Sequence, residues 1–282
     1  MKLFQIYDGF SIEKLQNRIS KSLVILSFIV SYFANTYIVK AQPSCEIKNR
    51  QIKPGETLVY EVFYHWGLIW MNAGLSTFEM KRDKLGGKDC FHIIGEGATY
   101  KNYDVFYRVR DRFDSWIDTV SFKPYRYIRN TYEGGTKVYN DTYFNYKKNE
   151  ATCFKIDKKV KVEKDTVKIL PCTFDVLTMI YYARTIDYSH CMKGEKIPIT
   201  LYLDGEIHDS LFIRYLGKEK IKTALGEKQC ILFSPLLIKG TIFSGGEGMK
   251  VWVTDDDKKI PLLIKTPIVI GEVQVKIKTI KD

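Results

Sequence analysis

The sequence predicts a mainly β protein, an antiparallel meander that forms a curved sheet or barrel-like sandwich with one principal helix (about 173–187) packed against it. Three observations support this fold class. From Glu56 onward, apolar residues recur with a period of two, as in strands with one buried face. The dipeptides Gly134-Gly135 and Asp204-Gly205 tolerate the positive φ of tight hairpin turns, which join antiparallel strands. Only TFDVLTMIYYARTID shows convincing helical spacing after the N-terminal segment.

Size and composition favour a globular chain. With 282 residues, 45% of them hydrophobic and 14% aromatic, the protein can bury a substantial core. We expect one β-rich domain over residues 42–282, with two packed lobes divided near the helix as the alternative. The net charge of +11 is spread along the chain, whereas a nucleic-acid reader usually concentrates charge on one helix or stripe. A solvated basic surface, with at most a weak preference for anionic lipid or polysaccharide, accounts for it better.

Residues 1–41 have the pattern of an export signal. Lys14, Arg18 and Lys21 precede the apolar run SLVILSFIVSYF, which is short for a membrane span. The residues Val39-Lys40-Ala41 place small side chains where a signal peptidase cleaves, so we predict cleavage before Gln42. An uncleaved N-terminal anchor is the competing interpretation, because the apolar stretch extends to Val39 with few polar interruptions.

The predicted strands follow in chain order. The two dipeptide turns separate the strand pairs on either side of them, and a polar turn at Asp255–Lys259 separates two strands near the end. Gly74 marks a bulge or a close approach of two backbones. The run Lys228–Phe233 is apolar without strict alternation and is expected to lie between two layers. The predicted strand segments are Glu56–Trp66, Leu68–Met80, Phe91–Tyr100, Asp104–Asp118, Pro124–Glu133, Thr136–Tyr146, Ile197–Leu203, Glu206–Leu216, Met249–Thr266 and Pro267–Ile280.

The predicted helix begins after Pro171, which ends the preceding strand. Thr173 is the expected N-cap, and Asp175 lies in the first turn, where the helix dipole favours a negative charge. Arg184 is expected to mark a charged exit from the helix. The apolar face is formed by Val176, Leu177, Ile180 and Tyr181.

Six cysteines, an even number, permit up to three disulfides in an oxidising compartment. No C-x-x-C occurs, which disfavours a zinc or redox site. A bridge between Cys172 and Cys191 would tie the two ends of the helix together. A straight fifteen-residue helix separates its ends by about 22 Å, whereas bridged Cα atoms lie within about 7 Å. That bridge therefore requires the chain to fold back after Asp187, and buried free thiols are the alternative.

Asp111, Asp114 and Asp118 are the acids closest to a catalytic arrangement. Paired carboxylates can act as general acid and base when burial separates their pKa values. On a regular strand Asp111 and Asp114 point to opposite faces, while Asp114 and Asp118 share one. Arginines are interleaved with them, so ion pairs and turn caps are the simpler interpretation.

Neither the histidines nor the C-terminal acids form a metal motif. His65, His92, His190 and His208 have no H-x-H or H-E-x-x-H spacing. The acids Asp255–Asp257 could bind Ca²⁺ but lack the spaced ligands of a dedicated loop, so a hairpin tip is the simpler interpretation. No G-x-S-x-G, P-loop or dinucleotide fingerprint appears. We therefore predict no cofactor, and we assign no catalytic, cofactor-binding or metal-ligating residue.

A set of short motifs, in order along the chain, resembles the DUF3108 family of exported bacterial proteins. That resemblance implies a β-rich exported protein of the periplasm or outer membrane of a Gram-negative bacterium, of the Bacteroidetes type, and supplies no catalytic residues. The motifs are Gly55-Glu56 with Tyr60, the Gly74 segment, Val109–Asp111, Ser115–Asp118, Pro124, Asp175 with Tyr181–Arg184, Gly226 with Cys230, Val251–Asp256 and Ile260-Pro261.

The high aromatic content, with 19 Tyr, 16 Phe and 4 Trp, either fills the core of a curved sheet or lines a cavity. We expect a non-catalytic binding or carrier module for an apolar or lipid-like ligand, held on a concave face that the helix partly covers. An envelope hydrolase acting on glycan or peptidoglycan through the Asp111–Asp118 region is one alternative, and a structural assembly partner in the envelope is another. We expect no nucleic-acid partner and only weak membrane association, and we leave the ligand-binding residues open.

Overall fold

The computed structural model describes residues 47, 51–156, 162–238 and 245–281, all within one compact unit, Pro43–Asp282. The predicted signal segment, 1–41, lies outside the described residues. The described part contains fifteen strands in one sheet and the helix α2 (Val176–Thr185). None of its helices is long and apolar enough to cross a membrane.

The strands of the first half, up to the helix, are β1 (Thr57–Trp66), β2 (Ile69–Leu85), β3 (Lys88–Thr99), β4 (Val109–Ile117), β5 (Pro124–Glu133), β6 (Thr136–Asn145), β7 (Glu150–Ile156), β8 (Val162–Lys168) and β9 (Thr173–Phe174). Those of the second half are β10 (Lys196–Leu203), β11 (Glu206–Thr223), β12 (Gly226–Pro235), β13 (Lys250–Thr254), β14 (Pro261–Pro267) and β15 (Glu272–Lys281).

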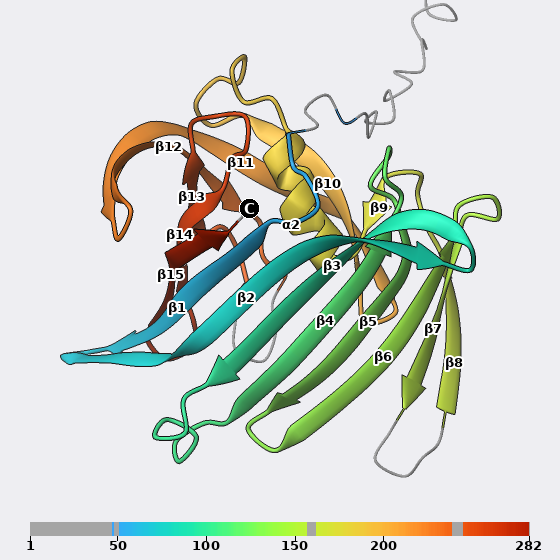
Figure 1. Cartoon of the computed structure of the whole chain (residues 1–282), viewed down its shortest axis with the longest axis horizontal. Helices are drawn as coiled ribbons and strands as arrows, with labels where there is room; N and C mark the ends of the chain where they lie inside the picture. Colours follow the sequence, from blue (N-terminus) through green and yellow to red (C-terminus); the bar gives the residue numbers. More distant parts are fainter. Residues whose placement is uncertain (1–46, 48–50, 157–161, 239–244, 282) are drawn as a thin grey trace, which may run out of the picture. The chain divides into compact units, whose positions relative to one another are not determined.

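The sheet is a continuous meander whose middle is the pairing of the first strand with the last. Its order is β8-β7-β6-β5-β4-β3-β2-β1-β15-β14-β13-β12-β11-β10-β9 (Figure 1). Neighbours are antiparallel, except that the short β9 runs parallel to β10. Because β1 pairs with β15, both halves of the chain belong to one hydrogen-bonded surface. The predicted curved antiparallel sheet with one principal helix is confirmed.

The local signals at turns are confirmed. Gly134-Gly135 joins β5 to β6, and Asp204-Gly205 joins β10 to β11 with φ values of 51° and 97°. At Gly74 the pairing of β1 with β2 shifts register, and a Cβ would collide with the carbonyl oxygen of Ala98 on β3. Glycine is required there because two backbones approach closely. The polar turn Asp255–Lys259 lies between β13 and β14, as predicted.

Three parts of the strand prediction were wrong. The strand predicted from Pro267 begins only at Glu272, because residues 268–271 form a turn in which Ile268 N–H donates to the carbonyl of Gly271 at 3.0 Å. The strand predicted from Asp104 begins only at Val109, because residues 101–107 form hydrogen-bonded turns such as Tyr107 N–H to the carbonyl of Tyr103. Apolar residues in that loop imitate the pattern of a strand. In addition, β7 and β8 were not predicted. The edge strand β8, with the sequence VEKDTVK, is mostly exposed and polar, so it carries little hydrophobic signal.

The helix is shorter than predicted and begins differently. Thr173 forms part of β9, opposite Thr200, and is not the N-cap. Asp175 is the N-cap instead of a first-turn residue, because its carboxylate accepts from Thr178 N–H at 2.9 Å. It also accepts hydroxyl hydrogen bonds from Thr178 and from Ser115 on β4, each at 2.7 Å. The N-terminus of α2 is thereby fixed to the sheet.

Helix α2 is buried on several sides because it packs between two parts of the curled sheet. On one side it contributes Leu177 and Tyr181 to a core built on β2 to β7. On another it contributes Met179 and Ala183 to a core built on β10 to β13. The contact with β3 is close: a Cβ at Gly95 would lie 2.8 Å from Leu177 Cδ2. The single apolar face predicted from sequence underestimates how much of the helix is covered.

Arg184 is not a charged exit, as the sequence suggested, but one of the largest fully buried side chains. Its guanidinium donates two hydrogen bonds to the carboxylate of Glu56, Nη1 to Oε1 at 2.6 Å and Nη2 to Oε2 at 2.8 Å. Its Nε donates to the carbonyl of Lys258 at 3.1 Å. The last turn of α2 is thus fixed both to the start of β1 and to the β13–β14 turn.

The strands β10 and β11, near one end of the sheet, contact the inner strands β5 and β6 through side chains near the β10–β11 turn. The carboxylate of Asp204 accepts hydrogen bonds from Arg129 on β5 and, at 3.0 Å, from Asn140 on β6. The hydroxyl groups of Tyr202 and Thr142 lie 3.0 Å apart. These polar contacts bring β10 and β11 against β5 and β6 without extending the sheet, which makes the curled sheet barrel-like.

We predict that Arg184→Met lowers the free energy of unfolding by about 3–5 kcal/mol, because it leaves the Glu56 carboxylate buried without its cation. Urea denaturation followed by circular dichroism measures this change. Arg214→Met is the matched control, since Arg214 makes the same two-pronged contact with Glu247 at an exposed position. The control should cost no more than about 1 kcal/mol. Equal losses in the two variants would contradict the anchoring role of Arg184.

Candidate functional site

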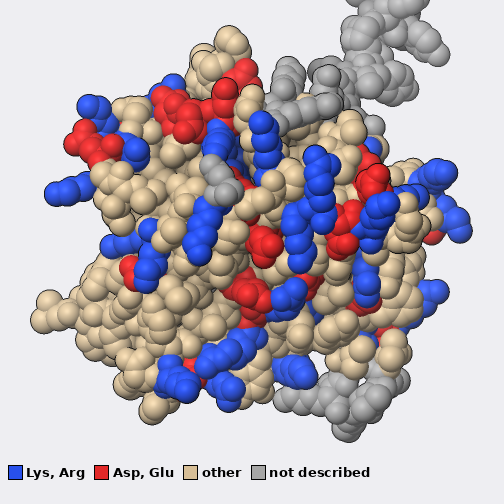
Figure 2. Space-filling view, in the orientation of Figure 1, with Lys and Arg blue, Asp and Glu red and all other residues tan. Residues whose placement is uncertain are grey.

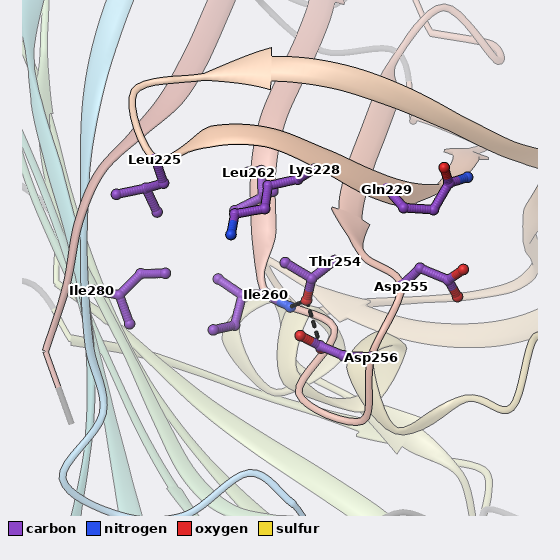
Figure 3. A pocket seen from close by; sticks show the side chains of 9 residues that line it. All are labelled: Leu225, Lys228, Gln229, Thr254, Asp255, Asp256, Ile260, Leu262 and Ile280. Carbon is purple, nitrogen blue, oxygen red and sulfur yellow. Dashed lines mark hydrogen bonds between the residues drawn. The ribbon is translucent and has the colours of Figure 1, made fainter.

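A pocket of about 260 Å³ opens between the β11–β12 turn, the β13–β14 turn and β15 (Figure 3). Apolar side chains from three separated parts of the chain, Leu225, Ile260 and Ile280, point into the same space. Leu262, almost completely buried, belongs to the core beneath it. The remaining lining residues are polar: Lys228, Gln229, Thr254, Asp255 and Asp256.

The polar wall of the pocket is the β13–β14 turn, whose side chains and backbone hydrogen-bond to one another. The Thr254 hydroxyl donates to Asp256 Oδ1 at 2.6 Å, and the same oxygen accepts from the backbone N–H groups of Lys258 and Lys259 at 3.0 Å (Figure 3). Asp255 forms an ion pair with Lys218 at 2.8 Å. These acids therefore already hold internal partners, as expected for a hairpin tip. Within the described ranges, no group of three or more His, Cys, Asp or Glu side chains could hold a metal ion.

The three acids singled out from sequence do not come together. Asp118 caps a turn, with Oδ1 accepting from the N–H groups of Val120 at 3.0 Å and Ser121 at 2.7 Å. Asp114 and Asp111 lie on opposite faces of β4, as the alternation predicts. Asp114 and Asp118 do not act as a catalytic pair, because each carboxylate is hydrogen-bonded to its own neighbours.

Asp114 lies on the face of the sheet opposite α2, in a cluster of charged side chains with His92 and Arg112. It accepts from His92 Nε2 at 2.8 Å and from Arg112 Nε and Nη2 at 2.8 and 2.9 Å. Burial alone would raise the pKa of Asp114, but the hydrogen bonds from His92 and Arg112 outweigh burial and lower the pKa. The His92 ring stacks on Trp116 with centroids 4.2 Å apart. Asp114 is therefore fully engaged in a structural cluster, in which His92 Nδ1 lies 3.4 Å from Asp83 Oδ2 without a hydrogen bond.

Asp111 lies on the inner face with a partner that sequence reasoning missed, Glu133 of β5. Burial, and then the negative charge of Glu133, raise the pKa of Asp111 to about 7. The backbone N–H of Tyr132 donates to Asp111 at 3.1 Å, which favours the charged form but does not cancel the shift. Opposite Asp111 on β3, a Cβ at Gly97 would meet nothing within 4 Å, so this part of the inner face is open.

The partner of Asp111 could have been found only by knowing the strand register. Glu133 is the last residue of β5 and pairs with Val109. Asp111 pairs with Thr131, so Glu133 is its diagonal neighbour on the adjacent strand. The pairing of β4 with β5 places the two acids on one face, although 22 positions separate them in sequence. A carboxyl group whose pKa is raised as that of Asp111 is can take up or release a proton near neutral pH, which is the chemistry expected of a general acid or base.

The remaining titratable candidates are dispersed. His65 Nε2 lies 3.0 Å from the carbonyl oxygen of Gly67, and His208 is paired with Glu206 across 3.8 Å. Cys191 is a free thiol while Cys172 is disulfide-bonded, so the bridge considered between these two does not form. The partner of Cys172 lies outside the described residues. The other free thiols are Cys90, Cys153 and Cys230, which are buried.

Together, the curled meander, the enclosed helix and the apolar pocket define a barrel-like β protein with an inner helix. The chain belongs to the family described as "protein of unknown function (DUF3108)", whose model matches residues 59–278. The resemblance seen in its motifs is thereby confirmed.

One of two similar solved structures supports the fold, with a TM-score of 0.52. The chain is similar to a β-barrel-like protein of the domain of unknown function DUF1849 from Brucella abortus, with 9% identity and a TM-score of 0.52, over 80% of this chain and 97% of that one. A protein with a YmcC-like fold from Bacteroides fragilis matches with 6% identity and a TM-score of 0.30, over 82% and 97% of the two chains. No protein with a curated function matches.

We predict that Asp111→Asn changes how stability depends on pH. The pKa of Asp111 in the folded state, about 7, lies above its ordinary value of about 3.9. Ionised Asp111 therefore lowers the free energy of unfolding of the wild-type protein. This loss is absent below pH about 3.9, grows as the pH rises and is complete above about pH 7. The variant should therefore be more stable than wild type at pH 8, by on the order of 1 kcal/mol after allowance for solvent screening, and equal to it at pH 4. Thermal denaturation across this range measures the difference.

Asp114→Asn is the matched control for this prediction. Its pKa is lowered, so removing its charge should destabilise the protein at pH 8, the opposite sign. Parallel pH profiles for Asp111→Asn and wild type would show that Asp111 and Glu133 do not share a proton.

Proposed function

We propose that this protein is an exported cell-envelope protein of a Gram-negative bacterium, in the periplasm or associated with the outer membrane, that binds an apolar or lipid-like ligand without catalysis. Two observations support export. Residues 1–41 have the pattern of a signal segment, and the disulfide at Cys172 is typical of an oxidising compartment.

The observation that carries the binding proposal is the pocket floored by Leu225, Ile260 and Ile280 and edged by Lys228 and Asp256. An apolar floor with a few polar groups at the rim is typical of small-molecule sites. Its volume of about 260 Å³ lies below the range of about 300–1,000 Å³ usual for whole ligands. The pocket therefore suits the apolar end of a lipid-like molecule, with the polar remainder held at the rim or in solvent.

A hydrolase is the second candidate, and the Asp111–Glu133 pair is the observation that favours it. A carboxyl group with a pKa near 7 on an open inner face could protonate a leaving group. Incubation with purified peptidoglycan tests this role: a hydrolase would release soluble fragments, and Glu133→Gln would abolish the release. Binding at the pocket requires neither result.

We predict that Leu225→Glu weakens binding of a dansyl-labelled undecanoic acid by tenfold or more, because it places a charge in the apolar floor of the pocket. Fluorescence titration measures the dissociation constant. Leu170→Glu is the matched control, since Leu170 is a similarly exposed leucine that does not line the pocket. This pocket would be ruled out as the ligand site if the wild-type protein did not bind the probe, or if the two variants weakened binding equally.

A further inference from the structure

One end of the sheet carries an unusual concentration of exposed apolar side chains. Leu68, in the β1–β2 hairpin, is fully exposed. Phe106, in the β3–β4 loop, is 74% exposed, and Val269, in the β14–β15 turn, is 65% exposed. Single exposed apolar residues are common on soluble proteins, but a contiguous group marks an interaction site. We call this group the loop-tip surface: Trp66, Leu68, Trp70, Phe106, Val269 and Ile270.

The three connections are neighbours because of the sheet order. The sequence of strands β4-β3-β2-β1-β15-β14 places the β3–β4 loop, the β1–β2 hairpin and the β14–β15 turn at the same end of the sheet, where the hairpin projects beyond the end of β3 because β2 pairs with β3 only from Gly74 (Figure 1). The Tyr64 hydroxyl donates to the carbonyl of Ile270 at 3.0 Å, and a Cβ at Gly271 would lie 3.2 Å from Trp66 Cβ. On the other side, Tyr100 N–H donates to the carbonyl of Ala73 at 2.9 Å.

A lysine lies beside this surface together with two acids: Asp104, which is paired with an arginine, and Glu272, which accepts a hydrogen bond from Gln274 Nε2 at 2.6 Å. The Lys276 ammonium lies 4.7 Å from the ring centroid of Phe63 and 5.0 Å from that of Trp70. Asp104, in the β3–β4 loop, is paired with Arg110 at 2.6 Å. Figure 2 shows Lys and Arg along the lower edge of the molecule, beside a largely uncharged projection at the left where the β1–β2 hairpin lies.

We propose that the loop-tip surface docks on an anionic phospholipid membrane. Tryptophan and tyrosine suit the membrane–water interface because their rings are apolar while the ring N–H or hydroxyl stays hydrated. The exposed aliphatic side chains between them enter the boundary of the acyl chains, and nearby lysines attract anionic headgroups. Residues 1–41 contribute five Lys or Arg and two Asp or Glu to the net charge of +11, so the chain that remains after the predicted cleavage before Gln42 carries +8, which adds a long-range attraction to such a membrane.

The shape of the surface favours a membrane over a second protein. Its apolar residues stand on three separate connections that project from the edge of the sheet, with the Leu68 side chain fully exposed. A fluid bilayer accommodates projecting side chains, whereas a protein interface needs a complementary pocket for each of them. The pocket lined by Leu225 and Ile280 shares none of these residues, so docking is independent of the proposed ligand site.

Tryptophan fluorescence tests the proposal at the surface itself. Of the four tryptophans, Trp66 and Trp70 belong to the loop-tip surface, while Trp252 is buried and Trp116 hydrogen-bonds Asp83 at 2.9 Å. The mature chain, residues 42–282, is mixed with vesicles of phosphatidylglycerol and phosphatidylethanolamine whose acyl chains carry bromine. We expect a blue shift and quenching of emission, both lost when Trp66→Phe and Trp70→Phe are combined. Vesicles of phosphatidylcholine alone should give at least tenfold weaker binding.

A matched pair of double variants separates docking from general hydrophobicity. Leu68→Glu with Val269→Glu should weaken vesicle binding, read by the same quenching, tenfold or more. Val120→Glu with Met192→Glu adds the same charge at two other exposed apolar sites outside the surface and should leave vesicle binding unchanged. The proposal would be overturned if the wild-type protein showed no quenching, or if both double variants reduced it equally. It would also be overturned if the protein were a soluble dimer that dissociates in the Leu68→Glu, Val269→Glu variant and not in the control.

Failure of docking and failure of ligand binding are distinguishable. Leu225→Glu should leave the quenching by brominated vesicles unchanged, because Leu225 lies outside the loop-tip surface. The double variant Leu68→Glu with Val269→Glu should in turn bind the dansyl-labelled fatty acid as wild type does. A loss shared by both assays in either variant would contradict the separation of the two sites.

Discussion

The placement of helix α2 inside the curled sheet depends on the buried ion pair between Arg184 and Glu56. A charged side chain can remain in a core only when a partner neutralises it and its hydrogen bonds are satisfied. Glu56 and the carbonyl of Lys258 satisfy Arg184, and they belong to opposite ends of the chain. At the other end of α2, Asp175 is satisfied by Ser115 and Thr178. The helix is therefore held at both ends by polar contacts that only one placement can satisfy.

Once the helix is fixed, the sheet must curl to cover it. Leu177 packs directly over Gly95, where any larger side chain would push the helix away, while Gly97 two positions further faces open space. The boundary between the packed and open parts of the inner face thus lies within one strand. The carboxyl pair of Asp111 and Glu133 lies in the open part, and this placement explains why it can be partly buried and still exchange protons with solvent.

The apolar features of the surface are distributed between two separate places along β15. Ile280, near its C-terminal end, lines the pocket, while Ile270 stands in the turn that precedes the strand. The charged cluster around His92 and Asp114, by contrast, lies on the opposite face of the sheet, where Asp114 accepts hydrogen bonds from both His92 and Arg112.

The sequence by itself determined the fold class and much of the local structure. The period of two, the turn at Asp204-Gly205 and the steric need for Gly74 are local properties, and local chemistry is enough to recognise them. It did not determine that residues 101–107 form a loop, that Asp175 caps the helix, or that Arg184 is buried. Each of these depends on a partner distant in the chain or on packing around it. The pairing of Asp111 with Glu133, the pocket and the loop-tip surface likewise exist only because strand register and sheet order bring separated residues together, which a periodic pattern in one segment cannot specify.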